Sequence, residues 1–445
     1  MFRVLKAMAK TVNWSNYFST FEEKTDNFVK SFGTRKIYAI GLMPVRGSSG
    51  FRKLDYEFAE KKINVSEIIT RLKKAHFNTL GIVIKDTDGA CAWNTRIGWN
   101  PMNRDILGEF SDVGKDNNIK IIVSFTSMND AYQGFIHPER VSVHGKNGKK
   151  LGRKYFKGEI STHLEGEMRV DLPEGVLLED YKQKIPFLTD QIDKEKGKAR
   201  STRGKGLIPL TSFMCPNSAH IDYLLDLTKE VIRNYSIQGF FADYIRYDNA
   251  FSDLCACERC VEKFREKYGK KPKLLKSKEW YDFKSSTITA YALKLHNSIK
   301  SIDKHCISGW FCLPGPRKLL SQKRLGQDWT ALSSILDIAS PMEYPYLMGT
   351  REDGYYWGKI GGLFYWYFIR NMKKRAKEYR SPVLAITNSV ECRTDEMVKQ
   401  LRAFDFGAGI AVFKYYGTTE EQWNALKKYA ETEIGVKNLS FGNNR

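Results

Sequence analysis

An acidic residue and a group of cysteines stand close together in the middle of the chain. The apolar run GFFA ends on Asp243, and Arg246 follows three residues later. Three cysteines then come in the spacing C-x-C-x-x-C: Cys255, Cys257 and Cys260. A carboxylate at the end of a buried strand can act as a nucleophile or carry a proton, whereas closely spaced thiolates bind metal ions. The stretch therefore offers residues for two kinds of chemistry.

The cysteine spacing favours a zinc site. Three thiolates within six residues can reach one ion, and structural zinc prefers four ligands in a tetrahedron. Cys215, in the segment FMCPNS, is the expected fourth ligand, and His220 is a weaker alternative. Four cysteine ligands leave no open coordination position, so the zinc would be structural rather than catalytic. The competing interpretation is three free thiols packed near the start of a helix.

Further acids, aromatic residues and cations follow other apolar runs. The additional carboxylates are Asp86, Glu343 and Glu391. Asp86 is also suited to binding a substrate. The other residues suited to this role are Trp93, Tyr244, Arg246, Trp310, Tyr344, Lys414 and Tyr415. Aromatic faces stack on sugar C–H surfaces, and charged groups hydrogen-bond hydroxyls. Cleavage of a glycosidic bond needs two carboxyl groups, so the set indicates a carbohydrate cleft. For any single acid the alternative is a structural ion pair, such as Asp243 with Arg246.

The elements that carry these residues alternate between strands and helices. Apolar runs predict eight strands, at 36–45, 79–86, 119–125, 239–245, 306–312, 336–344, 382–390 and 409–416. Apolar residues at helical spacing predict helices at 64–77, 104–117, 221–236, 285–302, 355–379, 394–407 and 420–433. Such alternation implies parallel strands joined by crossover helices.

Eight β–α units predict an α/β protein with a (β/α)8 TIM-barrel fold. The expected organisation is an N-terminal arm at 1–34, a catalytic barrel at 35–435 and a C-terminal tail at 436–445. A long insertion after strand 3 occupies 138–210. A doubly wound open sheet is the alternative, but the number of strands and the lack of a Gly-rich nucleotide-binding motif favour the barrel. In a barrel the chemistry lies at the carboxyl ends of the strands, where the acids above are found.

Composition narrows the set of partners. Lys and Arg outnumber Asp and Glu by 72 to 51, a net charge of +21. The positive charge permits nucleic-acid binding, but its spread along the chain favours a solvated basic surface. Aromatic residues make up 13% of the chain and fit either a thick core or stacking platforms. No secretory signal or long apolar segment stands out, so we expect a cytoplasmic protein without membrane contact and leave a homo-oligomer open.

The segment 215–269 resembles the central part of family 42 β-galactosidases. It begins with CPN, continues through a helix and the strand that ends on Asp243, and then reaches CACERC. In that family the first cysteine joins the later three on a zinc ion, which implies the ligands Cys215, Cys255, Cys257 and Cys260. The DYIRY motif at 243–247 and the PM-Y motif at Pro341–Tyr344 are also similar to barrel families described as hypothetical glycoside hydrolases.

One departure changes the expected activity. The β-galactosidases carry Asn-Glu at the end of the fourth strand, where this chain has Ala242 and Asp243. In barrel enzymes of the α-galactosidase and α-amylase types, an Asp at this position is the nucleophile. That similarity implies a nucleophilic role for Asp243 and argues against β-galactosidase activity.

We therefore expect a glycoside hydrolase that acts on an oligosaccharide or glycoside by a two-carboxylate, retaining mechanism. Asp243 is the expected nucleophile, Glu343 the acid/base and Glu391 the second candidate for that role. A cation at Arg246 would help to keep Asp243 ionised. The alternatives are a non-catalytic carbohydrate-binding barrel and a zinc-containing nucleic-acid-binding protein.

Overall fold

Eight parallel strands form the centre of the molecule. The computed structural model describes residues 19–46, 53–54, 56–143, 169–170, 213–247, 255–273, 275, 277–313, 325–342, 379–390 and 392–441. The strands are β1 (Ile37–Leu42), β3 (Thr79–Lys85), β4 (Lys120–Thr126), β6 (Gly239–Asp243), β7 (Ile307–Cys312), β8 (Ile338–Pro341), β9 (Ala385–Asn388) and β10 (Gly409–Phe413). Their order in the sheet is β8-β7-β6-β4-β3-β1-β10-β9, so neighbours in the barrel are also neighbours along the chain.

The sheet closes on itself between β8 and the segment that leads into β9. Ala339 N donates to Pro382 O at 3.1 Å, and Leu384 N donates to Ala339 O at 2.9 Å. Met342 and Ile386 form a further parallel bridge. Following the paired residues once round the barrel displaces the register by eight residues, as in TIM barrels. The (β/α)8 prediction is confirmed, each predicted strand is present, and the open doubly wound sheet is excluded.

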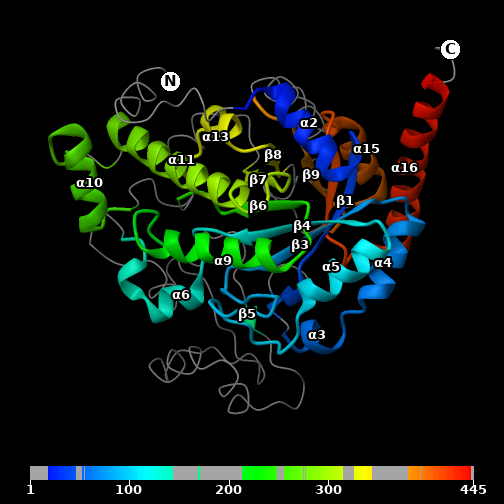
Figure 1. Cartoon of the computed structure of the whole chain (residues 1–445), viewed down its shortest axis with the longest axis horizontal. Helices are drawn as coiled ribbons and strands as arrows, with labels where there is room; N and C mark the ends of the chain where they lie inside the picture. Colours follow the sequence, from blue (N-terminus) through cyan, green and yellow to red (C-terminus); the bar gives the residue numbers. More distant parts are fainter. Residues whose placement is uncertain are drawn as a thin grey trace.

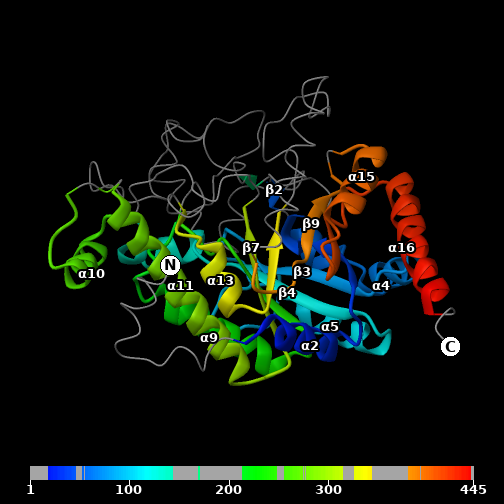
Figure 2. The same ribbon diagram turned by 90° about the horizontal axis from the view of Figure 1, so that it is seen from above.

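Helices surround the strands (Figures 1 and 2). They include α4 (Val65–Lys74), α5 (Ile106–Asp116), α9 (His220–Asn234), α11 (Lys278–Lys300), α13 (Trp329–Ile335), α15 (Thr394–Phe404) and α16 (Glu420–Phe441). Side-chain oxygens cap several N-termini, as Asp105 does for α5 and Asp328 for α13. A membrane crossing needs about 20 apolar residues in one helix, and no helix among the described residues meets that need.

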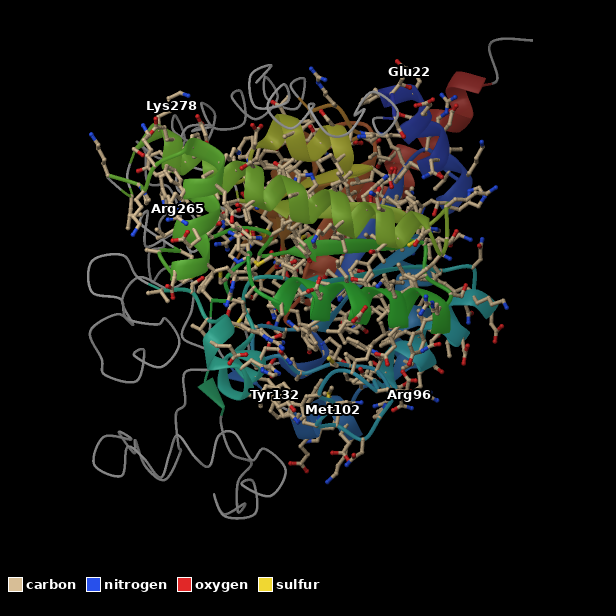
Figure 3. All side chains as sticks on the ribbon, turned by 60° about the vertical axis from the view of Figure 1, so that its left-hand side comes forward. Glu22, Arg96, Met102, Tyr132, Arg265 and Lys278 are labelled. Atoms are coloured by element: carbon tan, nitrogen blue, oxygen red, sulfur yellow. The ribbon has the colours of Figure 1, made fainter. Side chains whose placement is uncertain are left out.

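Further elements lie in the loops. Helix α10 (Glu258–Tyr268) begins at the cysteines, where a helix start was expected, whereas α3 (Tyr56–Lys61), α6 (Ala131–Ile136) and the small parallel pair β2 (Lys53–Leu54) and β5 (Arg169–Val170) were not predicted. Helix α10 projects from the barrel beside one end of α11 (Figures 1 and 2). The predicted helix at 355–379 and most of the predicted insertion at 138–210 lie outside the described residues. Charged side chains, including Glu22, Arg265 and Lys278, extend from the outer helices (Figure 3).

Helix α2 (Phe21–Phe32) closes one end of the barrel. Its Phe28 and Phe32 are buried in one cluster with the inward-facing Phe241 and Ile307 of the strands. The ammonium group of Lys24, which is 1% exposed, donates to the carbonyls of residues 333, 334 and 336 at the end of α13. The predicted N-terminal arm therefore contributes a helix that seals the amino ends of the strands.

At the opposite end of the barrel, the described residues leave the inner face open to solvent. Along five strands the inward-facing residues near the carboxyl end are half-buried, while their outward-facing neighbours are buried. These half-buried residues include Gly41, Val83, Asp243, Phe311 and Phe413. Solvent thus reaches the barrel interior from the carboxyl ends of the strands, the end that carries catalytic sites in this fold.

Candidate functional site

Asp243 ends β6 on the inner face of the barrel. It shares this face with Phe241, two residues earlier, because side chains alternate along a strand. Its partner across the β4–β6 pairing is Thr126. The carboxylate atom Oδ1 accepts a hydrogen bond from Tyr244 N at 2.7 Å, while the residue as a whole is half-buried. The carboxylate is therefore both fixed by the backbone and within reach of solvent.

The chain turns sharply after Asp243. Tyr244 adopts the left-handed backbone conformation, with φ of 46°, which is uncommon for a residue with a side chain. Arg246 is 1% exposed, and its guanidinium lies 4.4 Å from the centre of the Tyr244 ring. This cation–π contact fixes Arg246 beside the turn. Its predicted role in keeping Asp243 ionised stays a prediction.

A buried network anchors the backbone of Asp243. Ser127, which follows β4, donates its N–H to Asp243 O at 2.7 Å. The hydroxyl of Tyr291 lies 3.3 Å from Ser127 Oγ, and His220 Nε2 lies 2.8 Å from Ser127 O. Burial lowers the pKa of His220 to about 4, so the ring is neutral at pH 7 and Nε2 carries the proton. His220 therefore supports Ser127, and the sequence offered no signal for this contact.

Asp86 reaches the same region from β3. Thr126 donates its hydroxyl to Asp86 O at 2.9 Å, and Asp86 Oδ1 accepts from Thr87 N at 2.6 Å. The predicted acids Asp86 and Asp243 thus lie on either side of β4, linked through Thr126. Directly beside Asp86, Lys85 and Asp130 form a fully buried ion pair of 2.8 Å.

The cysteine cluster forms as predicted. Cys215 Sγ lies 3.6 Å from Cys257 Sγ and 3.4 Å from Cys260 Sγ. Together with Cys255, these sulfurs all lie within 4.8 Å of one another. In a tetrahedron with Zn–S bonds of about 2.3 Å, the sulfurs stand about 3.8 Å apart. The four thiols therefore fit a tetrahedral metal ion, and His220 is not one of the group.

Hydrogen bonds among the four cysteines favour a thiolate at one of them. Bonds from the other three cysteines lower the pKa of Cys257 far below its usual value, whereas bonds within the cluster raise the pKa values of Cys215 and Cys260. Cys257 is also the N-cap of α10, and a helix N-terminus stabilises a thiolate. Thiolates are the form that binds zinc, so Cys257 supplies the negative charge with which a metal ion would first interact.

The cluster joins three segments of the chain. Cys215 N donates to Arg140 O at 2.7 Å, and Ala256 N donates to Val143 O at 2.9 Å. Cys255 Sγ in turn accepts from Val143 N at 3.3 Å. A metal at this position would therefore hold the loops that follow β4 and β6 together, on both sides of the peptide that carries Asp243.

Three predicted aromatic ligands are packed in the protein core. Trp93 and Trp310 are both 0% exposed and Tyr415 is 6% exposed. Trp93 donates to Glu230 at 2.9 Å, and Tyr415 packs against Trp423 at a ring distance of 5.5 Å. Trp310 faces outward, because its neighbour Phe311 faces the barrel interior. None of these three rings offers an open face to a ligand.

Other predicted site residues are buried or lie outside the described part of the chain. Lys414 follows β10 and is 1% exposed. Glu343, Tyr344 and Glu391 fall in segments outside the described residues, so the position of the second carboxylate stays a prediction.

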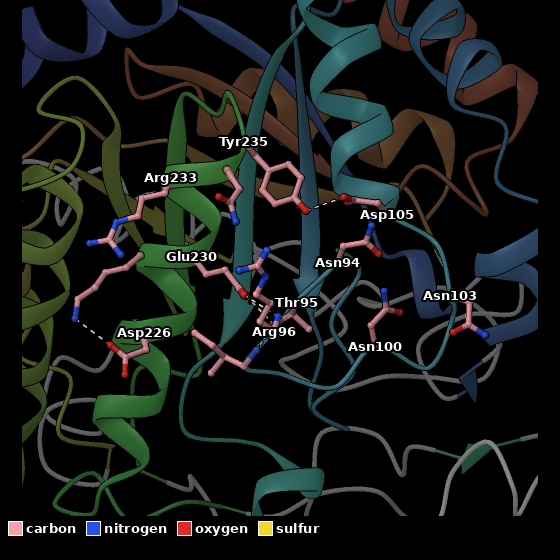
Figure 4. A pocket seen from close by; sticks show the side chains of 13 residues that line it. Asn94, Thr95, Arg96, Asn100, Asn103, Asp105, Asp226, Glu230, Arg233 and Tyr235 are labelled. Carbon is pink, nitrogen blue, oxygen red and sulfur yellow. Dashed lines mark hydrogen bonds and ion pairs between the residues drawn. The ribbon is translucent and has the colours of Figure 1, made fainter.

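A separate polar cavity of about 920 Å³ lies on the outside of the barrel. Its walls are the loop at 94–105 and the last turns of α9 (Figure 4). Its acids are engaged locally: Glu230 accepts from Thr95 and Trp93, and Asp105 caps α5 and accepts from Tyr235. This cavity is distinct from the open end of the barrel, and its acids serve the structure.

The likeness to known proteins is structural. No protein-family model and no curated protein matches the sequence. A β-galactosidase from the psychrophilic Marinomonas ef1 is similar in structure, with a TM-score of 0.56 and 11% identity over 91% of this chain and 60% of that one. An α-L-fucosidase isoenzyme 2 from Paenibacillus thiaminolyticus gives 0.52 and 12%, over 92% of this chain and 50% of that one.

A β-galactosidase from the Antarctic haloarchaeon Halorubrum lacusprofundi is a third such structure, with a TM-score of 0.52 and 9% identity over 89% of this chain and 57% of that one. This chain therefore spans between half and three-fifths of the length of these three proteins. At such identities the likeness concerns the fold. The structural neighbours of this (β/α)8 barrel are glycoside hydrolases.

Proposed function

We propose that this protein is a glycoside hydrolase with its active site at the open end of the barrel. The observation that carries the proposal is Asp243, an ordered and half-buried carboxylate on the inner face at the carboxyl end of β6. Catalytic residues of this fold lie at such positions. The glycoside hydrolases among its structural neighbours support the same class of reaction.

The proposed mechanism retains the configuration of the sugar. Asp243 attacks the anomeric carbon while a protonated carboxyl group, from Glu343 or else Glu391, gives its proton to the departing glycosidic oxygen. The same carboxylate then takes a proton from water, which displaces Asp243 from the glycosyl-enzyme. A carboxyl separation of about 5–5.5 Å would fit this mechanism, and about 6.5–9.5 Å would fit inversion.

Neighbouring groups have supporting roles in the proposal. Asp86, Arg246 and Lys414 are each 1% exposed and would fix the groups that contact the substrate. The half-buried Tyr244 would contact it directly. A zinc ion on the four cysteines would hold the loops around Asp243 and would leave no ligand position for a substrate. The buried rings Trp93, Trp310 and Tyr415 are left out of the binding surface because they are packed in the core.

The test is a screen of nitrophenyl glycosides and natural oligosaccharides with matched variants. Asp243→Asn removes the nucleophile and should lower kcat at least 1,000-fold, since covalent catalysis is lost. Asp226→Asn makes the same change at an exposed position on α9 and should keep wild-type kcat. Full turnover by Asp243→Asn would refute the assignment. Saccharide binding without turnover by the wild type would indicate a binding protein instead.

A further inference from the structure

Gly81 is a glycine that the fold itself does not require. It lies in the middle of β3 and lacks the left-handed backbone conformation that favours glycine. Among the described residues, a Cβ atom at this position would meet Ile40 O at 3.7 Å and Gly41 Cα at 3.9 Å, which are ordinary contact distances. Glycine within a strand costs roughly 0.5–1 kcal/mol relative to alanine, and often marks the close approach of a ligand or another backbone.

Other strand glycines have a packing reason. A Cβ on Gly309 would lie 2.5 Å from the ring of Phe241, and a Cβ on Gly41 would lie 3.2 Å from Phe413. The space that a side chain would occupy at these two glycines is filled by aromatic rings of the same protein. Beside Gly81 no atom of the described residues comes closer than 3.7 Å, so these residues leave the space available to a ligand.

The surface around Gly81 is apolar and reached by solvent. Five half-buried, inward-facing residues of β1, β3 and β10 form it, and we call them the inner-wall patch: Gly41, Gly81, Val83, Ala411 and Phe413. None of these five carries a hydroxyl, amide or charged side chain. Ser124 is paired with Val83 on the next strand but is only 4% exposed, so it adds little polar surface.

The patch begins at the level of Asp243 and continues below it. In this barrel each strand is displaced by one residue relative to its neighbour, as the shear of a TIM barrel requires. Val83, two strands from β6, therefore shares a layer with Asp243. Gly81 lies two residues deeper, about 6–7 Å along the strand. A sugar attacked by Asp243 would reach this depth with one edge of its ring.

We infer that the inner-wall patch receives an apolar edge of the sugar and that Gly81 determines specificity. This inference rests on the proposed function. The substituent on sugar carbon C5 that enters this patch is a hydrogen, as in a pentopyranose, or a methyl group, as in a 6-deoxyhexose. It is not the hydroxymethyl group of a hexose. A hydroxyl placed here would lose its water without gaining a side-chain partner, which is unfavourable. One group of this size in an apolar site changes kcat/KM by about 10–200-fold.

The experiment uses the full chain and nitrophenyl glycosides that differ only in the 6-hydroxyl group. D-Fucosides and D-galactosides form such a pair and are tested in both anomers, with pentopyranosides beside them. The wild type should prefer a 6-deoxy or pentose substrate by at least tenfold, and Gly81→Ala should lower kcat/KM for it by about 10–200-fold. Gly81→Ala should keep or raise the unfolding temperature, since no contact is closer than 3.7 Å.

Val83→Thr is the matched variant, because it keeps the side-chain volume but adds a hydroxyl that can pair with the 6-hydroxyl group, and it should improve hexosides relative to 6-deoxy substrates. Wild-type kinetics and wild-type selectivity in folded Gly81→Ala would overturn the inference. If the wild type cleaves no glycoside, the proposed function fails, and the inference is then tested by saturation-transfer NMR with D-fucose, D-xylose and D-galactose. Binding that Gly81→Ala weakens at least tenfold would support it; no binding, or equal binding by the variant, would overturn it.

Discussion

Lowering the pH should destabilise this protein through His220. The folded state keeps this histidine neutral, and burial lowers its pKa from the usual 6.5 to about 4. The charges that face it are Asp130, which raises the pKa, and Lys85 and Arg140, which lower it. Because the unfolded chain binds the proton more tightly, the contribution to stability is fully present above pH 6.5. It is lost as the pH falls from 6.5 towards 4.

The size of the effect follows from the two pKa values. With 6.5 in the unfolded chain and about 4 in the folded protein, His220 alone costs ~2 kcal/mol at pH 5 relative to pH 7.5. Burial also lowers the pKa of His296 to about 4, so the wild type should lose about twice this amount. Both histidines act in the same direction, and a variant is needed to separate them.

Urea unfolding at pH 7.5 and pH 5 measures the effect in the wild type and in His220→Gln. Glutamine keeps an N–H donor for Ser127 O but does not titrate, so this variant should lose ~2 kcal/mol less than the wild type on acidification. His305→Gln, at an exposed position, is the control and should behave as the wild type does. Equal pH dependence in His220→Gln and the wild type would refute the reasoning.

Three other perturbations test the supporting structure. Mass spectrometry of the purified protein should show one zinc ion per chain, and a metal-free wild type would contradict the zinc site. Cys260→Ser should weaken zinc binding and lower the unfolding temperature. Lys85→Met should lower the free energy of unfolding by about 3–5 kcal/mol, because it leaves Asp130 buried without its cation. Adding Asp130→Leu to this variant should recover part of the lost stability, whereas additive losses would contradict the pairing. Phe28→Ala should cost about 3–5 kcal/mol in urea unfolding, and a loss under 1 kcal/mol would show that α2 does not seal the barrel.

The fold was predictable because the barrel strands have strong local signals. Runs such as 79–86 and 409–416 are short, apolar and separated by helical periodicity, and this alternation alone favours a parallel barrel. The cysteine group was predictable for a similar reason, since three ligands stand within six residues. Cys215 is the one ligand that is distant in sequence. It was identified because it begins the segment 215–269, which resembles the family 42 β-galactosidases.

The lining of the site could not be predicted in the same way. Trp310 and Phe311 are adjacent, and the sequence does not reveal which of them faces the barrel interior. Pairing with β6 and β8 decides this, and it places Trp310 among the helices. The support that Ser127 gives to Asp243 depends on backbone atoms, which carry no sequence signature. The sequence gives no signal for a role of Gly81 either, because that role depends on the space beside its backbone in the folded protein.

The most direct test of the central claim is chemical rescue of Asp243→Gly. This variant removes the proposed nucleophile and leaves room for a small anion at the end of β6. With a nitrophenyl glycoside that the wild type cleaves, it should be almost inactive until sodium azide is added. The product should then be a glycosyl azide whose anomeric configuration is opposite to that of the substrate. Wild-type hydrolysis by Asp243→Gly without azide would contradict the account.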